Sequence, residues 1–176
     1  VISFSTVHWL LQEGGWQFSD EFKDPLHPEF THLRQVYLLA DPNYSGRITV
    51  PVLFDKKTQT IVNNESSEII RMLNSEFNHL AKNPTLDLYP PHLRAKIDEI
   101  NDWVYNQINN GVYKCGFARS QEAYEEAYDK LFEGLDKVDE ILSNSRYLTG
   151  DTFTEADVRL WTTLVRFDPV YVGKYR

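Results

Sequence analysis

The sequence contains very little cysteine, because Cys115 is the only one among its 176 residues. A single cysteine forms no intramolecular disulfide and does not supply a zinc site built on several thiolates. The histidines show no metal-ligand spacing and no matched carboxylate partner, so we predict no metal site. The lack of a disulfide framework favours a reducing compartment, and we expect the protein in the cytoplasm.

Positive charge and long apolar runs are also scarce. The 18 Lys and Arg residues stand against 26 Asp and Glu residues, which gives a formal net charge of −8. An acidic chain without clustered Lys and Arg is a poor match for a phosphate backbone, so we do not expect a nucleic-acid partner. No apolar run reaches the roughly 18 residues that a membrane-spanning helix needs, so we expect no membrane partner either.

Hydrophobic periodicity in the first half of the chain predicts an α/β domain over residues 1–82. Its expected elements are a strand over residues 1–7, a helix over residues 29–40, strands over residues 48–54 and 60–62 that form a hairpin, and a helix over residues 66–73.

After residue 82 the pattern changes to long helical stripes, which predict an all-α domain over residues 90–176. A first helix is expected from Pro91 to Ile108, ended by Asn109-Asn110-Gly111. Ser120 is expected to cap a second helix, and a third is expected over residues 155–167.

The Val50-Pro51 pair lies at the start of an expected buried strand. Proline donates no backbone hydrogen bond and is normally kept out of central strands, which suggests that this backbone is reserved for a partner other than the sheet. The proline ring also restricts Val50 and permits a cis peptide bond. An edge strand with a tolerated proline explains the pair equally well.

Glu65 and Ser66 lie where a strand passes directly into a helix. The free N–H groups and positive dipole end of a helix start bind a carboxylate, and a serine hydroxyl adds a donor. An adjacent glutamate binds an ammonium group, so together they suit an amino-acid head group with both charges. The alternative is a plain cap, with Ser66 or Ser67 capping the helix and with Glu68 and Glu65 interacting favourably with the helix dipole.

Two further features point to structure and not to chemistry. Thr154 and Asp157 have the spacing of a capping box at the start of the third helix. Cys115 follows the expected end of the first helix, where the dipole disfavours a thiolate, so we interpret it as structural.

The order of strand, Val-Pro, hairpin and Glu-Ser at a helix start resembles the glutathione site of thioredoxin-fold transferases. Longer strings at residues 44–53, 61–72, 109–114 and 147–173 look like the glutathionyl-hydroquinone reductases, which are xi/omega-like glutathione S-transferases. The resemblance implies a partial thioredoxin-like domain, lacking its first strand and helix, followed by a glutathione-transferase-type helical bundle.

The resemblance also implies roles for individual residues. Val50 pairs its backbone with the cysteinyl unit of glutathione, while Glu65 and Ser66 hold the γ-glutamyl amine and carboxylate. The other implied contacts are Trp16 beside glutathione, Arg34 and more weakly Arg47 as cationic contacts, and Tyr105 in an aromatic-substrate pocket.

The resemblance further implies a cysteine in a Cys-Pro-Trp context that attacks the sulfur of a glutathionyl-hydroquinone. The hydroquinone leaves, and a second glutathione resolves the mixed disulfide.

No Cys-Pro pair occurs in the sequence, so we expect that cysteine before Val1 and a parent chain that extends beyond both ends. Glutathione as co-substrate, a small aromatic substrate and a homodimer are implied as well. Two alternatives stay open: an omega-like thioltransferase or dehydroascorbate reductase, and a non-catalytic glutathione-transferase-like binding module.

Overall fold

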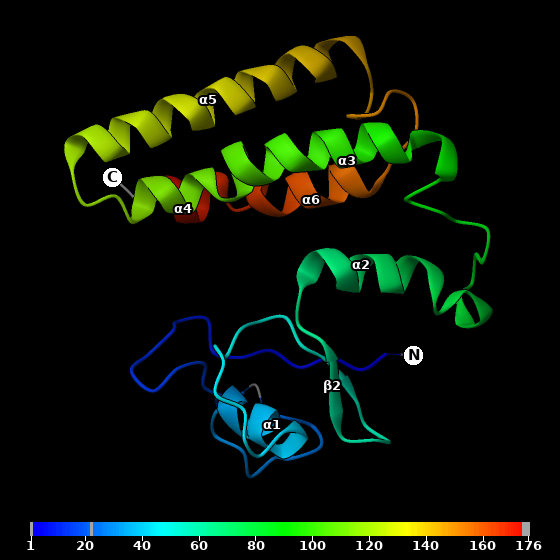
Figure 1. Cartoon of the computed structure of the whole chain (residues 1–176), viewed down its shortest axis with the longest axis vertical. Coiled ribbons are helices and arrows are strands. Elements are labelled where there is room, and N and C mark those ends of the chain that lie inside the picture. Colours follow the sequence, from blue (N-terminus) through cyan, green and yellow to red (C-terminus); the bar gives the residue numbers. More distant parts are fainter. Residues whose placement is uncertain (1, 22, 174–176) are drawn as a thin grey trace. The chain divides into compact units, whose positions relative to one another are not determined.

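The computed structural model describes residues 2–21 and 23–173, which fall into two compact units divided between Pro84 and Thr85 (Figure 1). The elements of the first unit are α1 (Leu33–Ala40), β1 (Leu53–Asp55), β2 (Thr60–Asn63), α2 (Ser66–Ser75) and the short 3₁₀ helix η1 (Asn78–Leu80).

Strands β1 and β2 form the predicted antiparallel hairpin, with Phe54 opposite Ile61 and Asp55 opposite Thr60. The first strand begins at Leu53, later than predicted, and Pro51 before it has no N–H group for a ladder. The strand predicted over residues 1–7 is wrong for its described part, because residues 2–7 form no strand. Their alternation meets no neighbouring strand, and the Phe4 side chain is 88% exposed.

Helix α1 provides the buried residues around which the first unit packs. Leu33, Val36 and Tyr37 lie on one face at helical spacing, and the Tyr37 side chain is only 1% exposed. The helix begins at Leu33 and not at residue 29, because the Gln35 side chain accepts hydrogen bonds from the backbone N–H groups of Thr31 and His32. The partly buried residues packed against this cluster are Val7, Trp16, Phe18, Phe30, Tyr44, Ile48, Val52, Phe54 and Ile61.

The second unit is helical throughout. Its elements are the 3₁₀ helix η2 (Pro91–Leu93), α3 (Arg94–Trp103), the π-helix η3 (Val104–Asn109), α4 (Gly111–Gly116), α5 (Gln121–Asn144), α6 (Glu155–Leu164) and the π-helix η4 (Phe167–Val172).

The first helical run ends at Asn109, the last residue of η3, as predicted, but the chain does not leave the helical conformation there, because Asn110 has helical dihedral angles and α4 begins at Gly111. Gly111 allows helices α4 and α5 to approach closely, since a Cβ atom there would lie 3.2 Å from Leu131 Cδ1. The Asn109 side chain is also engaged, because its Nδ2 donates to Thr163 Oγ1 at 2.7 Å. Asn109 and Gly111 therefore serve packing between helices, and Asn110 is a single turn residue between η3 and α4.

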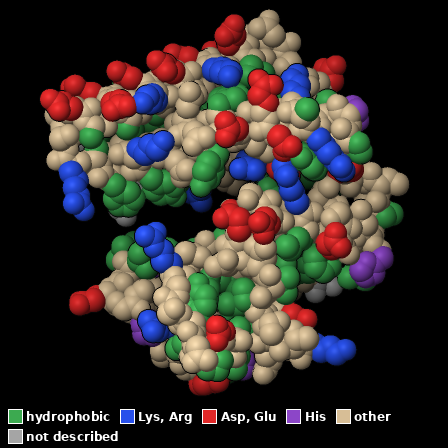
Figure 2. All heavy atoms as spheres, viewed as in Figure 1, with side chains coloured by type: hydrophobic (Ala, Val, Ile, Leu, Met, Phe, Trp, Pro, Cys, Tyr) green, Lys and Arg blue, Asp and Glu red, His purple; other side chains and the backbone are tan. Residues whose placement is uncertain are grey.

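The apolar stripes of the second unit form one core, as their spacing predicts. Its fully buried members include Ile97, Val104 and Ile108, and Ser120 Oγ caps α5 by accepting from Ala123 N at 3.2 Å. The opposite face of α5 is solvated, and Figure 2 shows acidic side chains gathered along this helix. No helix in the described part of the chain combines the length and the apolar character that crossing a membrane requires.

The capping box of α6 is confirmed. Asp157 Oδ2 accepts from the Thr154 backbone N–H at 2.9 Å, and the Thr154 side chain interacts with the Asp157 amide in return. Asp157 Oδ1 also accepts from Leu148 N at 2.9 Å, so the box joins the loop before α6 to the helix. Helix α6 ends at Leu164, three residues earlier than predicted, where the chain turns into η4.

Candidate functional site

Val50 and Pro51 lie before β1, joined by a cis peptide bond that the sequence analysis considered. The Val50 side chain is 43% exposed. In the described part of the chain, neither the N–H nor the carbonyl group of Val50 makes a hydrogen bond. Val50 therefore presents a free donor and a free acceptor to a ligand that pairs with the main chain.

The start of α2 is formed by Glu65 and Ser66. Glu65 is the N-cap, because its Oε1 accepts from Ser67 N at 3.2 Å and from Ser67 Oγ at 3.1 Å. The suggestion that Ser66 or Ser67 caps this helix is therefore wrong. Ser66 is exposed, and its N–H and hydroxyl groups have no hydrogen-bond partner among the residues described. This helix start has donors to offer an anion and carries a carboxylate beside them.

A hydrogen-bond network connects these two segments. The Tyr37 hydroxyl donates to the Thr49 carbonyl at 2.8 Å and accepts from Asn64 Nδ2 at 3.1 Å. Asn64 Nδ2 also lies 3.2 Å from Thr49 Oγ1. Thr49 directly precedes Val50 and Asn64 directly precedes Glu65, so the structure brings the two predicted binding segments together.

The sequence analysis did not identify this network. The spacing of α1 assigns Tyr37 to the core, and its ring is indeed buried. Helical periodicity does not show where a buried hydroxyl finds its partner, and both partners lie in irregular segments. The only available signal was the general rule that a buried tyrosine hydroxyl is hydrogen-bonded.

Trp16 and Arg34 have different environments. Trp16 is half-buried against the cluster of Leu33, Val36 and Tyr37, and its carbonyl accepts from Leu33 N at 2.9 Å. Arg34, on α1, and the weaker candidate Arg47 are exposed, and within the described residues neither forms an ion pair. Trp16 is thus held against the buried cluster that contains Tyr37, whereas no ion pair within the described residues holds either arginine side chain in place.

A cavity of about 520 Å³ lies in the first unit, between residues 2–7 and residues 50–54, with Leu33 and Val36 also lining it. Val50 lines this cavity, but Trp16, Arg34, Glu65 and Ser66 do not. The cavity and the start of α2 are therefore separate features. Val50 lines the cavity, and the residue before it, Thr49, is bonded to Asn64 before the start of α2.

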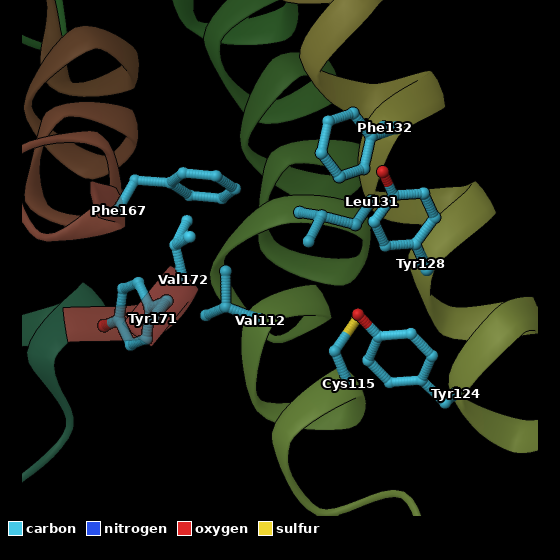
Figure 3. A pocket seen from close by; sticks show the side chains of 9 residues that line it. All are labelled: Val112, Cys115, Tyr124, Tyr128, Leu131, Phe132, Phe167, Tyr171 and Val172. Carbon is cyan, nitrogen blue, oxygen red and sulfur yellow. The ribbon is translucent and has the colours of Figure 1, made fainter. Parts of the chain in front are cut away.

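A second cavity, of about 220 Å³, lies in the helical unit and is mainly apolar (Figure 3). Figure 3 shows Cys115 on α4 facing Tyr124 and Tyr128 of α5, with Phe167 and Tyr171 of η4 on the other side. Burial raises the pKa of the Cys115 thiol, which keeps it protonated and supports its structural interpretation.

Tyr105, the predicted aromatic contact, lies on η3 and is 49% exposed. It does not line the apolar cavity of the helical unit. Its ring is exposed, and it lines neither of the two cavities described above.

Family models and known relatives both match the chain. The model for the glutathione S-transferase N-terminal domain matches residues 4–76, and the model for the C-terminal domain matches residues 121–175. Glutathionyl-hydroquinone reductase YqjG of Escherichia coli is 58% identical over 99% of this chain and 54% of its own length. Glutathione S-transferase omega-like 2 of Schizosaccharomyces pombe is 51% identical over 100% of this chain and 58% of its own.

Solved structures agree with these matches. Glutathione-bound YqjG superposes with a TM-score of 0.93 at 58% identity, covering 97% of this chain and 56% of that chain. The chain spans little more than half the length of the curated relatives it matches first. The predicted fold class, a thioredoxin-like part followed by a helical bundle, is confirmed. The chain belongs to the glutathione S-transferase family, among its xi and omega-like members.

Proposed function

We propose that the protein is a glutathione-dependent reductase that converts S-glutathionyl-hydroquinones to hydroquinones and releases oxidised glutathione. One observation carries the proposal: the free backbone of Val50 and the free helix start at Glu65 and Ser66 are joined through one hydrogen-bond network. The names of two relatives, both glutathionyl-hydroquinone reductases, support the substrate class.

Each part of glutathione has a partner of suitable chemistry in this arrangement. The γ-glutamyl carboxylate binds the N–H and hydroxyl groups of Ser66, where the helix dipole adds a favourable field. The γ-glutamyl ammonium binds the Glu65 oxygen that does not cap the helix. The cysteinyl unit exchanges backbone hydrogen bonds with Val50. Trp16 and Arg34 flank the tripeptide.

The proposed reaction is a two-electron reduction of an aryl thioether in two steps, of which the second is a thiol–disulfide exchange. In the first step a cysteine thiolate attacks the glutathionyl sulfur, the aryl carbon–sulfur bond breaks, the ring carbon gains a proton, and a mixed disulfide between the cysteine and glutathione forms. The thiolate of a second glutathione then attacks that mixed disulfide, so oxidised glutathione leaves and the enzyme thiolate is restored. We assign this thiolate to the cysteine that the family resemblance implies and not to Cys115, which is buried and protonated.

Tyr105 is our candidate for the aromatic hydroquinone, because its exposed ring is available for stacking. We further propose a homodimer that works in the cytoplasm. The yeast relatives named omega-like glutathione S-transferases support a second candidate, a thioltransferase or dehydroascorbate reductase that uses the same glutathione site.

Glutathione binding tests the site directly. Replacing Glu65 or Ser66 with alanine should weaken binding by about 1–3 kcal/mol, because a charged group of the ligand loses its partner. Isothermal titration calorimetry on the purified full-length protein measures this change.

Glu76→Ala is the matched control, because it removes an acidic side chain from the C-cap of the same helix, away from the helix start that carries the assigned contacts. Equal affinities for all of these variants would contradict the assigned site. Hydroquinone release from a glutathionyl-hydroquinone, compared with reduction of a small mixed disulfide or dehydroascorbate, separates the two candidate activities.

A further inference from the structure

We infer that Tyr37, Thr49 and Asn64 are positioning residues for glutathione, which hold the two halves of its site at a fixed separation without contacting the ligand. This inference rests on the proposed function, because it explains how the assigned contacts at Val50 and at Ser66 are kept in register. The evidence is the geometry of the three side chains and their positions in the sequence.

The Tyr37 hydroxyl is the centre of the network. It donates to the Thr49 carbonyl at 2.8 Å, and Asn64 Nδ2 donates to it at 3.1 Å. The Thr49 N–H also points to the same hydroxyl at 3.4 Å, and the Asn64 amide reaches Thr49 Oγ1 at 3.2 Å. Tyr37 is 1% exposed, while Thr49 and Asn64 are half-buried, so the hydroxyl at the centre of the network is its most protected group.

The network joins two segments that lie 15 residues apart in the chain. Thr49 is covalently bonded to Val50, and Asn64 to Glu65, so each partner of the tyrosine precedes a proposed ligand contact by one residue. The hairpin ends with the pairing of Leu53 and Asn63, so Asn64 follows the last strand pair directly, whereas Thr49 and Val50 lie before it. The side-chain bonds therefore extend the connection between the two chain segments beyond the end of the hairpin, to the residue that precedes Val50.

The network also selects which backbone groups face the ligand. Both the carbonyl and the N–H of Thr49 are directed to the Tyr37 hydroxyl. The N–H and carbonyl of the next residue, Val50, have no partner among the described residues. A peptide ligand that pairs with this segment is thus directed to Val50, because the backbone N–H and carbonyl of the preceding residue already have a hydrogen-bond partner.

Tyr44 provides a matched control for a purely structural role. Its ring lies 4.9 Å from the Tyr37 ring, centroid to centroid, and its hydroxyl donates to a backbone carbonyl, that of Arg47, at 2.9 Å. Tyr37→Phe and Tyr44→Phe therefore each remove one tyrosine-to-carbonyl hydrogen bond from the same apolar cluster. The Tyr37 bond connects the two binding segments, whereas the Tyr44 bond does not.

The test measures glutathione affinity by calorimetry and the melting temperature of each variant in the full-length protein. Tyr37→Phe should weaken glutathione binding about tenfold, the scale of one lost buried hydrogen bond. Tyr44→Phe should lower the melting temperature by less, because its single hydrogen bond is exposed, and should leave the affinity unchanged. Thr49→Ser keeps the hydroxyl that accepts from Asn64 and should bind like the wild type, while Thr49→Val, of similar shape, should bind several-fold more weakly.

Several results would overturn the inference. Affinity losses of equal size in Tyr37→Phe and Tyr44→Phe would show a general packing effect, and unchanged affinity in Tyr37→Phe and Thr49→Val would show that the network does not position the ligand. If the wild type does not bind glutathione, the proposed function fails as well. If the wild type binds and Ser66→Ala weakens binding while Tyr37→Phe does not, only the inference fails.

Discussion

The two units of this chain use buried polar groups in opposite ways. In the helical unit, the buried polar residues Asn101 and Glu155 connect helices that a continuous apolar core already holds together. In the first unit the buried cluster is small, and the bonds of Tyr37 hold irregular segments that carry the proposed binding groups. We therefore expect apolar packing to dominate the stability of the helical unit, and hydrogen bonds to hold the proposed binding segments of the first unit.

The helical unit shows how such polar groups are accommodated inside a core. Asn101 Nδ2 donates to Glu155 Oε1 at 2.9 Å, and Arg159 Nη1 lies 3.5 Å from the same oxygen. The Glu155 side chain is 4% exposed, so its charge is balanced by these neighbours and not by water. All three residues lie on α3 or α6, which makes this a connection between helices.

The largest expected loss of stability comes from a substitution in the helical core, and it should leave glutathione binding by the first unit unchanged. Ile97→Ala should lower the free energy of unfolding by about 2–5 kcal/mol, because Ile97 is fully buried and the change leaves a cavity. Denaturant unfolding of the full-length protein measures this loss. The folded fraction of the variant should bind glutathione with the affinity of the wild type.

Leu142→Ala is the control for that prediction. Leu142 belongs to the apolar stripe that the spacing of α5 indicates, but it is 41% exposed, so its removal should cost no more than about 0.5 kcal/mol. Similar losses for Ile97→Ala and Leu142→Ala would show that burial does not determine stability in this unit.

A smaller effect is expected at the capping box of α6. Thr154→Ala should lower the free energy of unfolding by about 0.5–2 kcal/mol, since the Thr154 side chain is fully buried and interacts with the Asp157 amide. Thr154→Ser keeps the hydroxyl and should recover most of that stability in a thermal melt. If Thr154→Ala weakened glutathione binding without lowering stability, it would contradict the assignment of stability to the helical unit and of binding to the first unit.

The sequence was most informative where a local rule determined the structure. Helical spacing located the core of the second unit, and the Thr154–Asp157 spacing located a cap that needs only neighbouring residues. The β-hairpin and the start of α2 followed from similar short-range patterns.

Features that depend on distant partners were not predicted. Residues 2–7 alternate like a strand but pair with no strand, and Gly111 looks like a helix end although it serves contact with Leu131. The Tyr37 network was missed for the same reason, because Thr49 and Asn64 approach the hydroxyl only after the chain has folded.

A crystal structure of the full-length protein with glutathione tests the central claim most directly. We predict backbone hydrogen bonds of about 2.9 Å between the cysteinyl unit and Val50, with the γ-glutamyl carboxylate on the N–H and hydroxyl of Ser66 and its ammonium on Glu65. The Tyr37, Thr49 and Asn64 contacts should be unchanged. Glutathione bound away from Val50, with the start of α2 contacting no part of it, would contradict this account.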